Sequence, residues 1–135
     1  MPTRIPFPPE IAEVYFDFDW DREAVWALDL EPEIIDRSLL DWHLDLPFWS
    51  SRRSEMLFDV EPRKVIEDMS AHPRHARRIE QADLGFSIDV MEYSGRLCIM
   101  DGTHRLAKAV LEGRAEVTVR RIPRSAIPNV KTELG

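Results

Sequence analysis

The fold is decided by the stretch LCIMDGTHRLAKAVLEG, residues 97–113. Four consecutive apolar residues at 97–100 predict a strand that is buried on both faces, and Asp101-Gly102 is typical of a tight turn. From Thr103 onward the apolar residues repeat at helical spacing, and Gly113 suits a helix end, where the backbone takes positive φ. The stretch therefore predicts a buried strand, a turn and a short helix in direct succession.

The start of this helix has the composition of an anion site. A helix that follows a strand end directs unpaired N–H groups and the positive end of its dipole at whatever lies above the strand. His104 and Arg105 add two side-chain donors in the first turn, so we expect a phosphate or carboxylate to bind there. The alternative is a purely structural N-cap supplied by Thr103 or Asp101, and the sequence does not choose between these two residues.

The same residues carry a family resemblance. The motif Asp101-Gly102-Thr103-His104-Arg105-Leu106-Ala107, with the strand expected at 116–122, resembles the phosphate-binding motif of the ParB/sulfiredoxin superfamily. The similarity is strongest over residues 83–123 and extends from about residue 42. It implies an α+β fold, a small mixed sheet with packed helices, that binds a nucleotide's phosphates at this loop, but it does not name the reaction.

Departures from the family pattern narrow the expected activity. Sulfiredoxins place a catalytic cysteine where this chain has Thr103, and Cys98 falls in the predicted buried strand, so sulfinic-acid reduction is not expected. The free-serine-kinase branch carries a second histidine at the position of Thr103, so the resemblance does not carry kinase specificity over. Chromosome-partitioning ParB proteins continue into a helix-turn-helix domain, which is not found after the last expected strand here, so partitioning in that form is not expected.

Two functions from different classes follow from the resemblance. In the first, the chain is an enzyme with phosphoryl-transfer, NTPase or nuclease activity on ATP or CTP, with or without Mg²⁺. Gly102, Thr103, His104 and Arg105 would bind phosphate oxygens, Arg52 would reach over them, and Asp101 or Glu61 would position a nucleophile or Mg²⁺. In the second, the chain is a non-catalytic regulatory module that binds a nucleotide or a partner. Capping of the helix expected after Pro62 is the structural alternative for Glu61.

Composition and charge limit the partners. The formal net charge is −7, and residues 1–51 hold 12 acidic against 3 basic side chains. Such a chain is a poor generic binder of nucleic acid, although local basic patches could hold a strand. No run of 18 apolar residues occurs, so we expect no membrane span, and the single Cys98 agrees with a reducing, cytoplasmic location. The sequence leaves open whether the chain forms a homo-oligomer.

The length predicts one domain at residues 13–123, with an extended proline-rich lead-in at 1–12 and a loosely packed tail at 124–135, with Ile127 and Val130 as candidate docking residues. We expect strands at 14–16, 24–30, 56–60 and 115–122, a hairpin of 86–92 with 96–100, and helices at 32–40, from 62 and at 72–79. The aromatic segment 41–49 closes the core or, through Trp42, Phe48 or Trp49, offers a base-stacking platform. No metal site is expected, because Pro73 interrupts the histidine pair His72 and His75.

Overall fold

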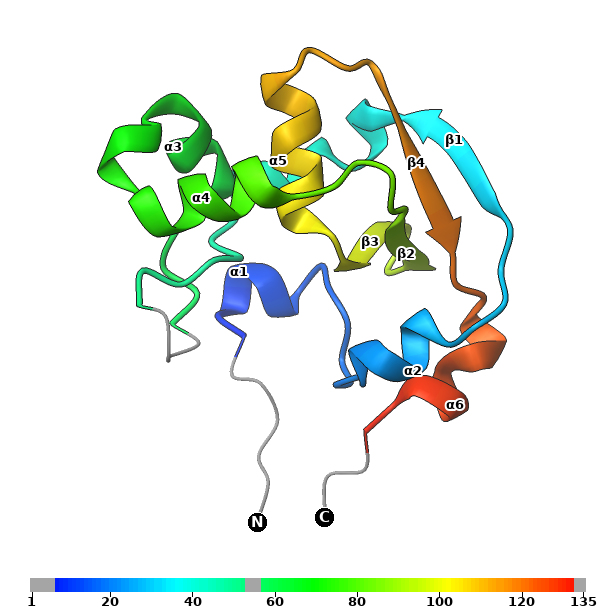
Figure 1. Cartoon of the computed structure of the whole chain (residues 1–135). Coiled ribbons are helices and arrows are strands. Elements are labelled where there is room, and N and C mark those ends of the chain that lie inside the picture. Colours follow the sequence, from blue (N-terminus) through cyan, green and yellow to red (C-terminus); the bar gives the residue numbers. More distant parts are fainter. Residues whose placement is uncertain (1–6, 53–56, 133–135) are drawn as a thin grey trace.

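The chain folds into an α+β structure, as predicted, with helices packed on one small mixed sheet (Figure 1). The computed structural model describes residues 7–52 and 57–132, and within them the strand order is β1-β4-β2-β3. The strands are β1 (Pro32–Asp36), β2 (Ile88–Tyr93), β3 (Arg96–Asp101) and β4 (Glu116–Arg121). The β4–β2 pair is parallel, whereas β1–β4 and β2–β3 are antiparallel.

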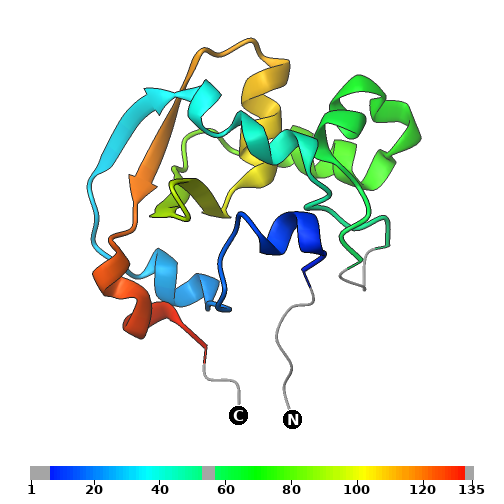
Figure 2. The ribbon, with the colours of Figure 1, turned by 180° about the vertical axis from the view of Figure 1, so that it is seen from behind.

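The helices gather at two ends of this sheet. Helix α2 (Arg22–Trp26) lies with α6 (Ile127–Val130) at one end, near α1 (Pro9–Ala12). At the other end α3 (Pro62–Glu67) and α4 (Pro73–Gln81) pack on α5 (Thr103–Leu111), as Figure 2 shows from behind. Turns of 3₁₀-helix occur at Arg37–Leu39, Asp41–Asp45, Met69–Ala71 and Arg124–Ala126. No helix in the described ranges has the length and apolarity needed to cross a membrane.

Strand β3 is buried on both faces, which confirms the prediction from its apolar run. Leu97 and Ile99 pack in the same cluster as Leu106 of α5, whereas Cys98 and Met100 point to the opposite side. There they meet a cluster of aromatic side chains from the first third of the chain: Tyr15, Phe16 and Phe18. A strand with period-2 alternation and two apolar faces requires such a cover on each side.

The outer edge of β3 is closed by aromatic side chains instead of another strand. The side chains donate to three carbonyl groups and accept from one N–H: Tyr15 to Ile99 O, Trp20 to Met100 O at 3.2 Å, Trp42 to Leu97 O at 3.0 Å, and Ile99 N to His43 Nε2 at 2.9 Å. An open edge leaves a row of backbone N–H and C=O groups without partners. These bonds supply partners to backbone groups that would otherwise be buried without a hydrogen bond.

The second half of the chain matches its predicted elements. The hairpin turns through Ser94 and Gly95, which both have positive φ, as a two-residue turn between antiparallel strands requires. Val117 and Val119 of β4 are buried, in alternation with more exposed residues, and the helices predicted from Pro62 and near Pro73 are present.

The first third departs from the prediction. Residues 14–16 form no strand, the expected strand at 24–30 begins with the last residues of α2, and the expected helix at 32–40 begins with β1. Asp21 caps α2 by accepting from Glu23 N at 3.0 Å, which favours a helix. In β1, Ile35 is buried while Ile34 is 67% exposed, so the segment follows the strand period.

Three further segments differ from expectation. In the segment expected as a strand at 56–60, residue 56 lies outside the described residues, and Val60 makes an isolated bridge with Trp49. The lead-in expected to be extended contains α1, whose Ile11 is fully buried. The tail packs more firmly than expected: Ala126 and the predicted docking residue Val130 belong to the same core cluster as Ile11, and Ile127 packs against it.

Candidate functional site

The motif at residues 101–105 has the predicted local structure. Strand β3 ends at Asp101, Gly102 turns the chain with φ +118°, and α5 begins at Thr103. The N-cap position belongs to Gly102, so neither residue proposed as a cap, Thr103 or Asp101, caps the helix with its side chain. Within the described residues no side chain caps the start of α5, which leaves the first N–H groups of the helix available to a ligand.

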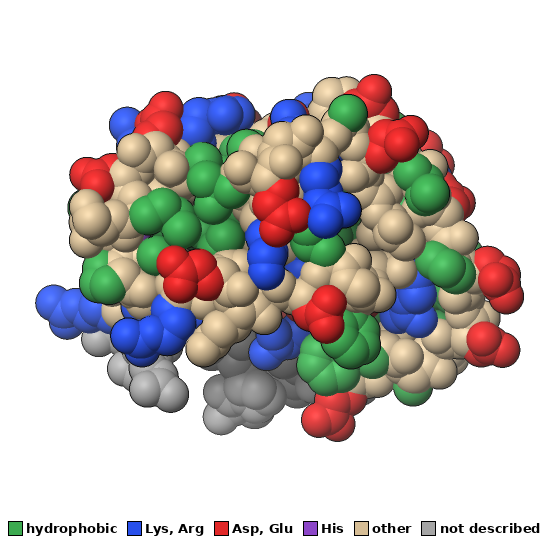
Figure 3. Space-filling view, turned by 45° about the horizontal axis from the view of Figure 1, so that its top comes forward, with side chains coloured by type: hydrophobic (Ala, Val, Ile, Leu, Met, Phe, Trp, Pro, Cys, Tyr) green, Lys and Arg blue, Asp and Glu red, His purple; other side chains and the backbone are tan. Residues whose placement is uncertain are grey.

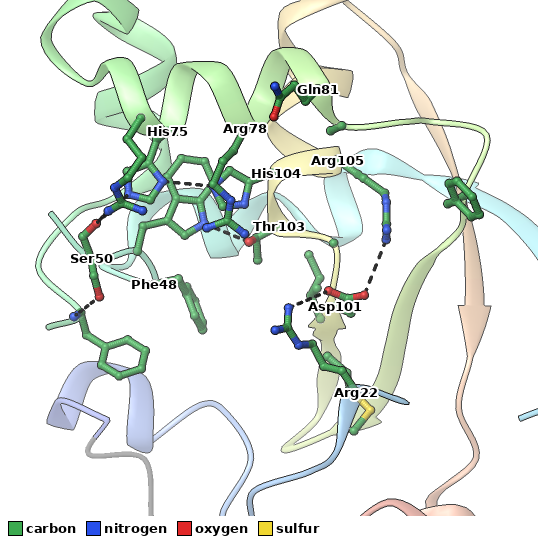
Figure 4. Close-up of a pocket in the computed structure, with 18 of the residues that line it drawn as sticks. Arg22, Phe48, Ser50, His75, Arg78, Gln81, Asp101, Thr103, His104 and Arg105 are labelled. Atoms are coloured by element: carbon green, nitrogen blue, oxygen red, sulfur yellow. Dashed lines mark hydrogen bonds and ion pairs between the residues drawn. The ribbon is translucent and has the colours of Figure 1, made fainter. Parts of the chain in front are cut away.

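A cavity of about 800 Å³ lies over this helix start (Figure 4). Phe48, Trp49 and Phe86 contribute aromatic surface to its wall. In the described part of the chain, the charged side chains that line it are five arginines and two aspartates: Arg22, Arg52, Arg74, Arg78, Arg105, Asp83 and Asp101. The cavity is therefore net positive in a chain whose overall charge is negative.

Asp101 is held by donors and cations. Its Oδ2 accepts from Trp26 Nε1 at 2.7 Å and lies 3.9 Å from Arg105 Nη1, and its Oδ1 lies 4.0 Å from Arg22 Nη1. Arg105 also donates to the carbonyl of Ser87 at 3.2 Å. These contacts fix the direction of the Arg105 guanidinium, but they do not give Asp101 the surroundings of a Mg²⁺ ligand.

His104 is covered by a stack of rings (Figure 4). The indole of Trp49 lies parallel to it, with ring centroids 4.1 Å apart and an angle of 2° between the planes. Trp49 is held in turn, because its Nε1 donates to Thr103 Oγ1 at 2.9 Å. Trp49 lines the cavity but is only 4% exposed, so little of its ring is open to a base. Phe48 lines the cavity, and Trp42 is not among its lining residues.

A second histidine, which the sequence analysis did not select, joins this stack. His75 of α4 places its Nδ1 3.1 Å from His104 Nε2, and its own Nε2 lies 2.7 Å from the carbonyl oxygen of Ser50. That carbonyl also accepts from the guanidinium of Arg74. Burial lowers the pKa of His104 to about 2, with Arg78, His75 and Arg74 adding to the shift. Burial likewise lowers the pKa of His75, so both rings are neutral at pH 7.

The pKa of Arg78 reflects the excess of positive charge in the cavity. Burial lowers the pKa of its guanidinium, and the like charges of Arg74 and Arg22 lower it further, whereas Asp101 opposes the shift. A bound anion would relieve this repulsion, because opposite charge favours the charged form of a group.

Of the remaining predicted site residues, all but Glu61 line the cavity. Arg52 lines the cavity, as do Gly102, Thr103, His104 and Arg105. Glu61 precedes α3 and is not among the lining residues of the cavity, and it makes no side-chain cap there. Among the described residues no group of three His, Cys, Asp or Glu side chains could hold a metal ion.

The sequence analysis missed Arg22, Arg74, His75 and Arg78. Three of these belong to α4, and their signal is the spacing of Arg74 and Arg78, which places both on one face of a helix. Arg22 gives no comparable signal, because the packing of α2 against the sheet alone brings it to the cavity. In comparisons with family models, curated proteins and solved structures, no significant match to this chain was found.

Proposed function

We propose that the chain binds a nucleotide, ATP or CTP, with its phosphates over the start of α5. The proposal rests mainly on one observation: four arginines line one cavity at the N-terminus of the nine-residue helix α5, which no side chain caps. They are Arg22, Arg74, Arg78 and Arg105. Guanidinium groups and helix N–H groups are the donors that proteins use for phosphate oxygens. The resemblance of residues 101–107 to the ParB/sulfiredoxin motif supports the same ligand class.

The size and lining of the cavity favour a nucleotide over inorganic phosphate. A volume of about 800 Å³ falls within the range of small-molecule sites, roughly 300–1,000 Å³, and greatly exceeds the needs of a single phosphate group. Phe86 is 65% exposed at the cavity and offers a ring face on which a base can stack. Any Mg²⁺ that accompanies the nucleotide would be held by phosphate oxygens and water, since Asp101 faces cations.

The charges on the face of the molecule seen in Figure 3 do not favour nucleic acid. Acidic and basic side chains are interspersed on the face of the molecule seen in Figure 3, without a continuous basic surface. Five arginines line the cavity, and their number suits a triphosphate better than an extended strand.

Calorimetric titration with ATP, CTP, GTP and ADP, with and without Mg²⁺, tests the proposal. Arg78→Gln removes a cavity cation, and we expect it to weaken binding by about 10- to 100-fold, the worth of a charge-assisted hydrogen bond. Arg77→Gln is the matched control, because Arg77 is an exposed neighbour on α4 that does not line the cavity. Saturable binding that Arg78→Gln weakens and Arg77→Gln preserves supports the site. No binding of any nucleotide, or equal losses in both variants, refutes it.

A further inference from the structure

A chain of hydrogen bonds runs from the carbonyl of Ser50 through His75 to His104, and it fixes the tautomers of both histidines. A carbonyl oxygen can only accept, so His75 Nε2, at 2.7 Å from Ser50 O, carries the proton and donates it. The Nδ1 of a neutral His75 then has a lone pair and accepts from His104 Nε2 at 3.1 Å. It follows that His104 is protonated on Nε2 and carries its lone pair on Nδ1.

Arg74 is compatible with this assignment. Its Nη2 lies 3.2 Å from His75 Nε2, but a guanidinium donates only, and the Ser50 carbonyl accepts from Arg74 as well as from His75. Two donors therefore share the two lone pairs of one carbonyl oxygen. A doubly protonated His75 is disfavoured, because burial and the charges of Arg74 and Arg78 lower its pKa.

The ring of His104 has little freedom to turn. Trp49 lies parallel over it and is itself bonded to Thr103, and His75 fixes the Nε2 side. The ring lines the cavity, and its hydrogen bond to His75 uses Nε2, which leaves the lone pair of the ring on Nδ1. A ring held in place, with its tautomer set by a second residue, is the arrangement of a general base.

We propose that His104 is the proton acceptor for hydrolysis of the bound nucleoside triphosphate and that His75 is the positioning residue that fixes its tautomer. The inference rests on the proposed function and adds a reaction to it. A water oxygen forms a bond to the terminal phosphorus while the bond from phosphorus to the bridging oxygen breaks. The electron pair leaves on the nucleoside diphosphate, and the water proton passes to His104 Nδ1 and then to solvent, leaving inorganic phosphate.

The charges around His104 couple its basicity to the ligand. The charged groups that face it are Arg74 and Arg78 from α4, with His75 as a neutral neighbour, and Asp101 and Arg105 lie in the same cavity. Burial is the main cause of the low pKa of His104, and in the free protein these arginines lower it further. The negative charges of a triphosphate offset the charges of the arginines, so the pKa of His104 rises when the nucleotide is bound.

The test combines binding, phosphate release and NMR on the full chain, with ATP and CTP as the probes. His104→Phe and His75→Phe keep a ring against Trp49 but remove the nitrogens. We expect His104→Phe to lower kcat at least 100-fold with little change in nucleotide Kd. Added imidazole should restore activity to His104→Ala. His75→Phe should lower kcat about 10-fold and change the pH profile. His72→Gln is the control, because His72 does not line the cavity.

Long-range nitrogen–proton NMR spectra give a readout that does not depend on activity. We expect the Nε2-protonated tautomer for both histidines in the parent, and a mixture of tautomers for His104 in His75→Phe. Nucleotide binding without phosphate release, or full activity in His104→Phe, overturns the inference and leaves the proposed function standing. Absence of nucleotide binding in the parent overturns the proposed function, and the inference falls with it.

Discussion

Replacement of Gly102 by alanine tests whether the turn between β3 and α5 sets the geometry of the cavity. Gly102 has φ +118°, in the left-handed region that residues with a Cβ rarely adopt, and an added Cβ would lie 3.2 Å from Arg105 Nη1 and from two carbons of Ile88. Ile88 is 2% exposed and cannot move aside without disturbing the core. The substitution therefore combines backbone strain with crowding.

The two costs can be estimated separately. Strained backbone at a non-glycine residue costs about 1–3 kcal/mol, and forced overpacking costs a further 1–3 kcal/mol. We expect Gly102→Ala to lower the free energy of unfolding by about 3 kcal/mol. For a chain of this length that corresponds to a fall in Tm of about 10 °C.

The assay is urea and thermal denaturation of Gly102→Ala beside Gly95→Ala. Gly95 also has positive φ, +79°, but no described atom outside its chain neighbours lies within 4 Å of an added Cβ. Its substitution therefore carries the strain alone, about 1 kcal/mol. Equal losses of stability in the two variants would show that Ile88 and Arg105 do not crowd the turn, and would refute the reasoning.

Two further predictions concern the closed edge of β3. Burial lowers the pKa of His43 to about 3, so between pH 6.5 and 3 the unfolded chain binds a proton that the folded chain does not. The contribution of His43 to the free energy of unfolding should then decrease by about 1.4 kcal/mol for each pH unit that the pH falls. In urea titrations at pH 7, 5 and 4, His43→Gln should remove this dependence on pH. Parallel pH dependences in parent and variant would contradict the prediction. Tyr15→Phe leaves the buried carbonyl of Ile99 without its donor and should lower the free energy of unfolding by about 1–2 kcal/mol. Tyr93→Phe is the control, because it loses a hydrogen bond to the exposed Asp17 and should lower the free energy of unfolding by less than about 0.5 kcal/mol. Equal losses in the two variants would count against the contact at the edge of β3.

The elements that the sequence predicts correctly are those specified by neighbouring residues. The apolar run at 97–100, the Asp-Gly turn and the helical spacing after Thr103 all act within a few residues, and the structure follows them. By contrast, residues 32–36 become a strand because β4, at least 80 residues later, pairs with them. Helix α2 is likewise tied to the sheet by Arg120, which donates to the carbonyls of Val25 and Leu28. Distant partners of this kind leave no local pattern.

The same distinction divides the candidate site. Gly102, Thr103, His104 and Arg105 could be selected from the sequence because they are contiguous. His75 and Arg78 lie more than 20 residues earlier, and the packing of α4 against α5 alone brings them to the motif. The arginines of α4 could not be assigned to the site from the sequence, because a helix whose polar face closes a cavity has the same pattern as one whose polar face meets water.

Both walls of the cavity are attached to the stretch that decides the fold. On one side Tyr15 and Trp20 line the cavity and donate to the carbonyls of Ile99 and Met100 at the edge of β3. On the other, α4 is held to α5 through the packing of Ile79 on Ala107, and carries the basic side chains. The separation of the walls is therefore set by the angle between β3 and α5, which Gly102 controls. For this reason a substitution at Gly102 should weaken nucleotide binding as well as stability, although its backbone rather than a side chain forms the site.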